Sequence, residues 1–154
     1  MSLDVALLVG GWSAERQVSL DKGLAVEKAL RALGYNVRVV DVKKNVTALV
    51  EALTPKPDVI FNNLHGTGGE DGVIQGVLEM LDVPYTHSNV CASAVAMDKP
   101  LAKALFKTVG VPSPAGALIS QERFLSDGSP IKPPYFIKPP QEGSSVDGFI
   151  VRGG

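Results

Sequence analysis

The sequence predicts an α/β protein in which a doubly wound parallel sheet is followed by the beginning of an α+β domain. Over the first 97 residues, continuous apolar runs alternate with segments whose apolar residues recur at helical spacing. Glycine-rich loops follow two of these runs, as is common where ligands bind at the carboxyl edge of a parallel sheet. From residue 98 the chain becomes proline-rich and the alternation stops. We therefore expect one domain over residues 1–97 and the incomplete start of a second over residues 98–154.

The strands of the first domain are expected at four short apolar segments: residues 5–9, 36–41, 58–61 and 83–86. Continuous apolar runs fit strands that are covered on both faces. Because a helical segment separates each strand from the next, the order predicts parallel pairing, with helices on both faces of the sheet.

The helices between these strands are expected from apolar residues at positions i, i+3, i+4 and i+7. Gly34 follows the first helix, which lies within residues 19–33, at the position where helices commonly end in a left-handed residue. Asn45 should cap the second helix, and a fourth helix should run to about Met97. The apolar sets are Val26, Ala29, Leu30 and Leu33 in the first helix, Val46, Leu49, Val50 and Leu53 in the second, and Ile74, Val77, Leu78 and Leu81 in the third.

The second domain should open with a helix that Asp98 caps, that carries Pro100 in its first turn, and that runs through Val109. A glycine and two prolines follow within residues 110–114 and should end this helix. The remaining elements are expected to be strands at residues 115–119, 135–138 and 148–152, with a flexible hairpin or lid at residues 139–147.

The composition excludes several classes of function. A chain of 154 residues with 45% hydrophobic content can bury a sizeable core. Its 15 basic and 16 acidic residues give a net charge of −1, which argues against a nucleic-acid-binding surface. No apolar run reaches the roughly eighteen residues of a membrane-spanning helix, and no basic leader opens the chain. Cys91 is the single cysteine, so no internal disulfide is expected, and the chain is interpreted as cytoplasmic.

The loop over residues 65–72 is the most informative segment of the chain. It follows an expected strand, precedes an expected helix, and contains four glycines within residues 66–72. Such a loop leaves backbone N–H groups uncovered and predicts a site for an anionic group. The dinucleotide-binding fingerprint is excluded because Asp71 stands where its third glycine would fall, and no nucleotide-binding P-loop pattern occurs in the chain. The loop therefore indicates a ligand site of another design.

Several polar residues have both a structural and a functional interpretation. Glu15, just after the Gly10-Gly11 turn, could complement a helix dipole or anchor the ammonium group of a substrate. His65 taken alone is more often structural than a ligand. The other residues are also structural when taken singly: Glu70 and Asp71 as acids at a helix N-terminus, Lys99 and Lys138 as surface lysines, and Ser144 and Ser145 as a polar loop.

Five short motifs carry more information together than singly. They are Gly10-Gly11-x-Ser13-x-Glu15-x-x-Val18-Ser19, His65-Gly66-x-Gly68-Gly69-Glu70-Asp71-Gly72-x-x-Gln75-Gly76, Met97-Asp98-Lys99, Ile137-Lys138-Pro139 and Glu142-Gly143-Ser144-Ser145-Val146. In order, spacing and residue type they resemble the D-alanine–D-alanine ligase family of the ATP-grasp superfamily, over residues 5–151. The histidine–glycine motif is the most specific of the five.

This resemblance implies a pre-ATP-grasp, Rossmann-like first domain that binds substrate, and a central ATP-grasp domain. It implies ATP-dependent, ADP-forming ligation of two D-alanines through an acyl phosphate. The dipeptide would be a precursor of peptidoglycan, so the implied biological role is cell-wall biogenesis and the maintenance of cell shape. The expected small-molecule partners are D-alanine and ATP, with Mg²⁺ bridging phosphates. Neither nucleic acid nor a membrane is expected as a partner, and a homodimer is left open.

The resemblance also implies a role for each site residue. Glu15 would bind the ammonium group of the first D-alanine, and His65 with Gly66 would lie beside its carboxylate. Ser144 would hydrogen-bond to this glutamate, which makes Glu15 and Ser144 the expected catalytic pair. The nucleotide would be held by Lys99 and Lys138 at its phosphates and by the lid residues Glu142, Gly143, Ser144 and Ser145.

Two departures limit what the resemblance implies. Asp147 separates the Ser-Ser-Val motif from Gly148, where relatives commonly have glycine directly. No metal ligands are assigned within the 154 residues; they are expected beyond Gly154, so this chain alone is expected to be inactive. Two alternatives stay open: a D-alanine–D-lactate ligase or other carboxylate–amine ligase, and a non-catalytic fragment that binds an amino acid or a nucleotide.

Overall fold

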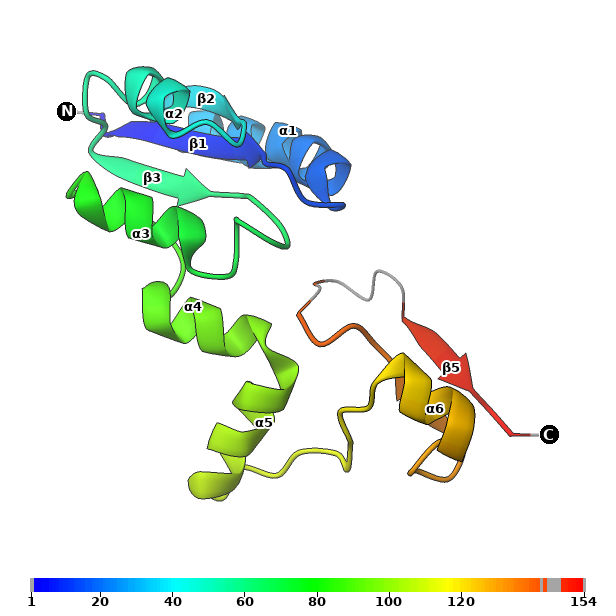
Figure 1. Cartoon of the computed structure of the whole chain (residues 1–154). Helices are drawn as coiled ribbons and strands as arrows, with labels where there is room; N and C mark the ends of the chain where they lie inside the picture. The colour runs from blue at the N-terminus through cyan, green and yellow to red at the C-terminus, as the bar shows by residue number, and fades with distance from the viewer. Residues whose placement is uncertain (1, 142, 144–147, 154) are drawn as a thin grey trace. The chain divides into compact units, whose positions relative to one another are not determined.

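The computed structural model describes residues 2–141, 143 and 148–153. The chain divides into two compact units, Met1–Ala94 and Val95–Gly154, so the division falls three residues before the expected domain boundary. Figure 1 shows the elements of both units in chain order. Each unit is described by itself below.

The first unit is built on a parallel sheet with the strand order β2-β1-β3. The strands are β1 (Asp4–Gly10), β2 (Asn36–Val42) and β3 (Val59–Asn62), and β1 pairs in parallel with both neighbours. The parallel sheet predicted from the sequence is thus confirmed for these three strands.

The fourth expected strand is reduced to a single parallel bridge between Ile60 and Tyr85. Two backbone hydrogen bonds form it: Ile60 donates to the carbonyl of Pro84 at 2.8 Å, and Thr86 donates to Ile60 at 3.0 Å. Pro84 has no N–H group, so it cannot donate to a longer ladder.

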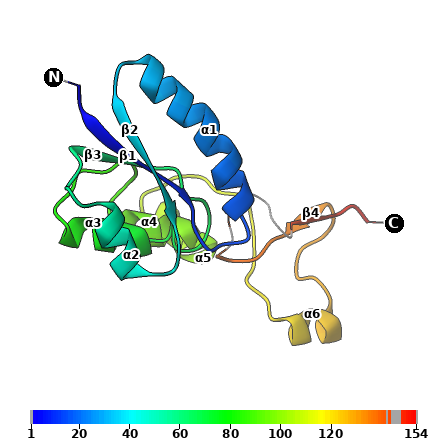
Figure 2. The ribbon, with the colours of Figure 1, turned by 90° about the horizontal axis from the view of Figure 1, so that it is seen from above.

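Helices cover both faces of this sheet, as expected (Figure 2). On one face, Leu7, Val9 and Val37 pack against residues of α1 (Arg16–Ala32). On the other face, a larger core contains residues from α2 (Val46–Ala52) and α3 (Val73–Met80). Each fully buried leucine or isoleucine in these cores contributes about 1.5–3 kcal/mol through the hydrophobic effect.

The helix ends follow the capping residues of the sequence. Gly34 has φ +87° and donates to the carbonyl of Arg31, while Tyr35 donates to Leu30, which together make a Schellman ending for α1. The side chain of Asn45 accepts from the amide of Ala48 and so caps α2. The α1 helix begins at Arg16, three residues before the expected segment, so its first turn lies directly after Glu15.

The α4 helix (Val90–Met97) leads into the second unit, where Asp98 accepts from the amide of Leu101 and caps α5 (Lys99–Thr108) as expected. The strands β4 (Tyr135–Ile137) and β5 (Phe149–Val151) pair antiparallel. The hydrogen bond from the amide of Leu101 lowers the pKa of Asp98, and a hydrogen bond from the Gln141 side chain lowers it by a smaller amount.

The expected strand at residues 115–119 is wrong, because these residues form no regular element. An unexpected helix, α6 (Gln121–Asp127), follows them. Ser120 caps it by accepting from Arg123 at 3.3 Å, and Gly128 ends it with φ +76°. The sequence did contain signals for α6: a serine that can cap a helix, a stretch free of glycine and proline, and a glycine directly after it.

Across the part of the chain that the structure describes, no helix combines the length and apolarity needed to cross a membrane.

Candidate active site

Two loops meet at the carboxyl edge of the sheet in the first unit. The first follows β1 and contains Gly11 and Glu15; the second follows β3 and contains His65. Because β1 and β3 are paired neighbours, their carboxyl ends lie side by side and their loops share one edge.

Two serine hydroxyls join these loops. The Ser13 hydroxyl donates to the main-chain oxygen of His65 at 2.6 Å and accepts from the amide of Glu15 at 3.1 Å. The Ser19 hydroxyl donates to the main-chain oxygen of Asn63 at 2.6 Å and accepts from the amide of Gly10 at 2.9 Å. The structure therefore brings the two expected substrate-binding segments together, although some fifty positions separate them in the sequence.

Glu15 is buried with only 2% of its surface exposed. It occupies the N-cap position of α1, but its side chain makes no capping hydrogen bond. Among the described residues, neither carboxylate oxygen has a hydrogen-bond partner. The helix dipole favours a negative charge at this position, yet it replaces only part of the hydration that a buried carboxylate loses. The arrangement suits a cationic hydrogen-bond donor.

Gly66 borders this carboxylate, and His65 precedes it in the same loop. A Cβ at position 66 would lie 3.1 Å from Oε1 of Glu15 and 3.0 Å from the hydroxyl of Ser13, and the φ of Gly66 is +69°. Glycine therefore leaves open the space next to the carboxylate. Nε2 of His65 is also buried and without a hydrogen-bond partner among the described residues. An acceptor and an imidazole nitrogen are thus unsatisfied at one edge of the sheet.

The glycine loop differs from the expected anion site. The amide of Gly66 donates to the carboxylate of Glu70 at 2.7 Å, and the amide of Gly68 donates to the carboxylate of Asp71 at 2.8 Å. The amides of Gly69 and Glu70 both donate to the carbonyl of Gly66. The loop's own carboxylates and carbonyls thus satisfy the amides of three of its four glycines, Gly66, Gly68 and Gly69, which were expected to be uncovered. Asp71 also accepts from Val73 in the first turn of α3, as its structural interpretation predicted.

Buried amide side chains support this loop. The carbonyl of Gly69 accepts from Asn62 at 3.0 Å and from Gln75 at 2.9 Å. The ring of Trp12 packs so closely on Gly68 that a Cβ at position 68 would collide with it. Trp12 thus fixes the glycine loop against the first loop, and its ring contributes to the adjoining hydrophobic core.

Arg16 ties the first loop to the end of β2. Its guanidinium makes a bidentate pair with Asp41, at 2.8 and 2.9 Å, and donates to the carbonyl of Gly11 at 3.0 Å. The hydrogen bond from Arg16, assisted by Lys43, lowers the pKa of Asp41 to about 2. The residue next to Glu15 is therefore anchored by its side chain.

The two expected ATP lysines lie in the second unit. Nζ of Lys99 donates to the carbonyl of Pro139 at 3.1 Å, and the amide of Lys99 donates to Pro140 at 3.1 Å. Nζ of Lys138 lies 5.4 Å from the centre of the Phe136 ring. The start of α5 and the exit of β4 are thus held together, and Lys99 reaches the residue that follows Lys138. Gly143 is among the described residues, whereas Glu142, Ser144 and Ser145 lie outside them.

Comparison with known proteins identifies the family. Residues 46–88 match the family model described as the D-ala D-ala ligase N-terminus. The D-alanine–D-alanine ligase of Rhizobium meliloti is 52% identical over 151 residues, which are 98% of this chain and 48% of the relative; that of Sinorhizobium fredii is 53% identical over 96% of this chain and 47% of the relative. The chain belongs to the D-alanine–D-alanine ligase family. It spans about half the length of these curated relatives.

Solved ligases of this family show the same fold. The D-alanine–D-alanine ligase of Bacillus anthracis, solved in complex with ATP, superposes with a TM-score of 0.76 at 28% identity, over 100% of this chain and 50% of that one. The Helicobacter pylori ligase superposes with a TM-score of 0.80 at 18% identity, over 99% of this chain and 57% of that one. The α/β fold with the start of an ATP-grasp domain is therefore confirmed.

Some structural features of this D-alanine–D-alanine ligase family member were not predicted from its sequence. The roles of Trp12 and of the Arg16–Asp41 pair were missed; the only signal for the first was that the single tryptophan directly follows Gly10-Gly11. The described residues contain no group of three or more His, Cys, Asp or Glu side chains that could hold a metal ion.

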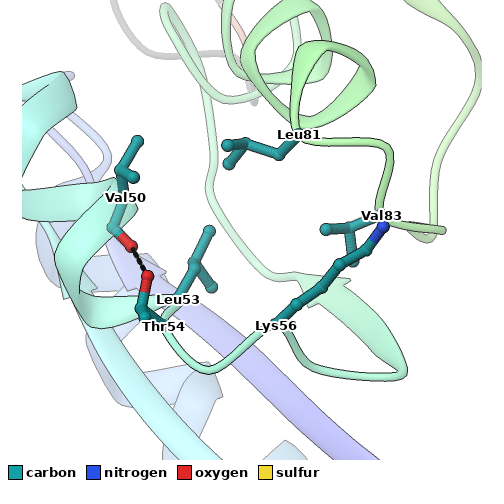
Figure 3. Close-up of a pocket in the computed structure, with 6 residues that line it drawn as sticks. All are labelled: Val50, Leu53, Thr54, Lys56, Leu81 and Val83. Carbon is teal, nitrogen blue, oxygen red and sulfur yellow. Dashed lines mark hydrogen bonds between the residues drawn. The ribbon is translucent and has the colours of Figure 1, made fainter.

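A hollow of about 170 Å³ lies elsewhere in the first unit (Figure 3). It is lined by residues from the carboxyl ends of α2 and α3 and the segments that follow them, so it lies at the opposite edge of the sheet from Glu15. Its lining is mainly aliphatic, and the Thr54 hydroxyl within it already donates to Val50. Lys56 also lines it and pairs with Asp82 at 3.3 Å, and no carboxylate lines it that could bind the ammonium group of an amino acid.

Proposed function

We propose that the complete protein joins two D-alanines into D-alanyl-D-alanine at the expense of ATP. The observation that carries this proposal is the buried carboxylate of Glu15, whose two oxygens have no partner among the described residues. A carboxylate kept from water in this way is suited to bind a cation. The family membership indicates which cation to test first, the ammonium group of D-alanine.

Glu15, His65 and Gly66 would together bind the first D-alanine. The ammonium group would donate to Glu15, while the substrate carboxylate would lie beside His65, whose Nε2 has no hydrogen-bond partner among the described residues. A Cβ at position 66 would lie 3.1 Å from Oε1 of Glu15, so glycine keeps this side of the carboxylate free of a side chain. Binding one amino acid at both ends fixes its orientation, which is the main requirement for an efficient transfer to its carboxylate.

Lys99 and Lys138 would bind the phosphates of ATP. Both are cations held near the exit of β4, and a solved relative of 28% identity contains ATP. The γ-phosphoryl group would pass to the carboxylate of the first D-alanine, releasing ADP. The amino group of the second D-alanine would then attack the acyl phosphate, lose a proton, and displace phosphate. Glu142, Gly143, Ser144 and Ser145 would cover the nucleotide and exclude water, and Ser144 would hydrogen-bond to Glu15.

The described residues do not fit a resident Mg²⁺ site, because no carboxylate cluster is present among them. Mg²⁺ is therefore part of the proposal only as a companion of ATP, and no step is assigned to it. The product would serve peptidoglycan precursor synthesis in the cytoplasm, where ATP is available.

The test is an assay of ADP and phosphate release by the complete gene product with ATP and D-alanine. We expect turnover with D-alanine and none with L-alanine. Glu15→Gln should raise the D-alanine concentration needed at the first site by about ten- to a hundredfold, the equivalent of one charge-assisted hydrogen bond, with the KM for ATP unchanged.

Glu27→Gln is the matched control, since Glu27 makes only a surface ion pair with Arg31 at 2.8 Å. Dipeptide formation should be absent from assays that lack ATP. Turnover with D-lactate as the second substrate, in preference to D-alanine, would contradict the proposed product. An unchanged D-alanine dependence in Glu15→Gln would contradict the role of the carboxylate.

A further inference from the structure

Ser13 lies between the two residues that the proposed function assigns to the first D-alanine, and the following inference rests on that function. Its hydroxyl uses both its hydrogen and its acceptor capacity at once. The hydrogen goes to the main-chain oxygen of His65 at 2.6 Å, and the oxygen accepts from the amide of Glu15 at 3.1 Å. One hydroxyl therefore connects the backbones of both residues.

The position of the Glu15 carboxylate depends on its backbone. Within the part of the chain that the structure describes, no hydrogen bond holds the carboxylate itself. The residue sits at the N-cap of α1, and the adjacent turn is closed by a bond from the amide of Arg16 to the carbonyl of Ser13 at 3.2 Å. The Ser13 hydroxyl is the direct link from this turn to the histidine loop.

We propose that Ser13 is a positioning residue that sets the separation between Glu15 and His65. A substrate that must meet both side chains at once is sensitive to this separation, because errors of about 1 Å in placement are costly to rate and binding. Gly66 fits the same interpretation, since the space that its missing Cβ leaves open is bordered by both Ser13 and Glu15.

Ser19 makes the same pair of bonds one step further from the substrate. Its hydroxyl links the amide of Gly10 to the oxygen of Asn63, and the amide side chain of Asn63 donates back to the oxygen of Ser19 at 2.8 Å. It is fully buried. Its amide donates to the carbonyl of Glu15 at 3.1 Å as an ordinary α1 helix bond, but its hydroxyl bonds to Gly10 and Asn63 and not to Glu15 or His65. Ser19 thus holds the strands' ends together, whereas Ser13 acts on the substrate residues themselves.

The first arm of the test is kinetic and uses the complete gene product. Ser13→Ala should raise the KM for D-alanine at the first site by about three- to tenfold, as expected for one lost hydrogen bond, and leave the KM for ATP unchanged. In a Glu15→Gln background the same change should add less than about twofold, because Ser13 acts through Glu15. Ser93→Ala is the matched control: it also removes a hydroxyl bond to a carbonyl, from Ser93 to Ser88 at 3.1 Å, and this bond involves neither Glu15 nor His65.

The second arm measures amide hydrogen exchange in the 154-residue chain without ligand. Ser13→Ala should speed the exchange of the Glu15 amide by about tenfold, whereas Ser93→Ala should leave it unchanged. This arm separates the two proposals. If Glu15→Gln leaves D-alanine use unaltered, the proposed function fails, while faster exchange in Ser13→Ala still supports the positioning role.

Three results would overturn the inference. These are an unaltered exchange rate of the Glu15 amide in Ser13→Ala, equal increases in the KM values for D-alanine and ATP, and full additivity of Ser13→Ala with Glu15→Gln.

Discussion

Replacing Glu15 with glutamine should stabilise the ligand-free protein, even though the same change weakens substrate binding. Glu15 is 2% exposed and its carboxylate has no partner among the described residues, so the folded state holds a charge with little compensation. Leaving a buried polar group unpaired costs about 1–3 kcal/mol, and more when the group is charged. The N-terminus of α1 offsets about 0.3–1 kcal/mol of this cost.

Glutamine keeps nearly the same shape and removes the charge, but its amide stays unpaired. We therefore expect Glu15→Gln to raise the free energy of unfolding by about 1–2 kcal/mol, which is about 3–6 °C in the unfolding midpoint. The emission of Trp12, the single tryptophan, reports on the unit that contains Glu15. Thermal and urea unfolding of the 154-residue chain, followed by this emission without amino acids, measures the effect.

Glu27→Gln serves as the control for the loss of a negative charge on α1. It removes a surface ion pair and should lower stability by only a few tenths of a kcal/mol. D-alanine should raise the midpoint of the wild-type chain more than that of Glu15→Gln, because a ligand stabilises the state that binds it. A Glu15→Gln protein that is less stable than the Glu27→Gln control would refute the reasoning, since the carboxylate would then be well compensated in the free protein.

Three further predictions concern the loops and the second unit. Gly66→Ala and Gly34→Ala both place a side chain at positive φ, and each should lower the free energy of unfolding in urea by about 1–2 kcal/mol. Only Gly66→Ala should also abolish D-alanine binding, because a Cβ at position 34 meets nothing within 4 Å. Equal binding by the two variants would contradict the assignment of this space to substrate. The Asp41 pKa of about 2 lies below its unfolded value of 3.8, so the stability from its pairing with Arg16 is present above pH 3.8 and is lost as the pH falls through 2. Unfolding measured over this pH range should therefore show a smaller loss of stability in Asp41→Asn than in the wild-type chain. Identical acid profiles of the two proteins would count against the pairing. Lys138→Ala should raise the KM for ATP by about tenfold or more in the complete gene product while leaving the D-alanine KM at the first site unchanged, and a reversed pattern would remove the lysine from the nucleotide site.

The sequence predicted the elements whose signals are local and repeated. Apolar residues at helical spacing predicted α1 and α2, and the structure contains both helices. Asn45 caps α2 and Gly34 ends α1, as predicted. The strand at residues 83–86 was overestimated because the apolar pattern does not register the missing N–H of Pro84. Helix α6 was missed because the surrounding prolines outweighed a short capped segment beginning at Ser120.

The candidate site was only partly predictable. The sequence indicated which loops meet, since the carboxyl ends of parallel strands share an edge, and it indicated Glu15 and His65. It could not indicate that Glu70 and Asp71 would fold back onto the amides of their own loop, because such a choice depends on backbone geometry. The Arg16–Asp41 pair was equally hidden, since Arg16 begins α1 and Asp41 lies in β2, and local patterns do not show which side chains of separate elements meet.

The serine bonds between the two loops are chemically one-sided. Ser13 and Ser19 contribute side chains, whereas the second loop contributes only the main-chain oxygens of His65 and Asn63 to the bonds that these hydroxyls donate. A main-chain oxygen is the same whichever side chain the residue carries. Position 65 can therefore be varied in a mutant library without removing the bond that spaces the loops, which makes it a natural place to redesign which amino acid the first site accepts. Position 13 offers no such freedom, because there the side chain itself makes the bond.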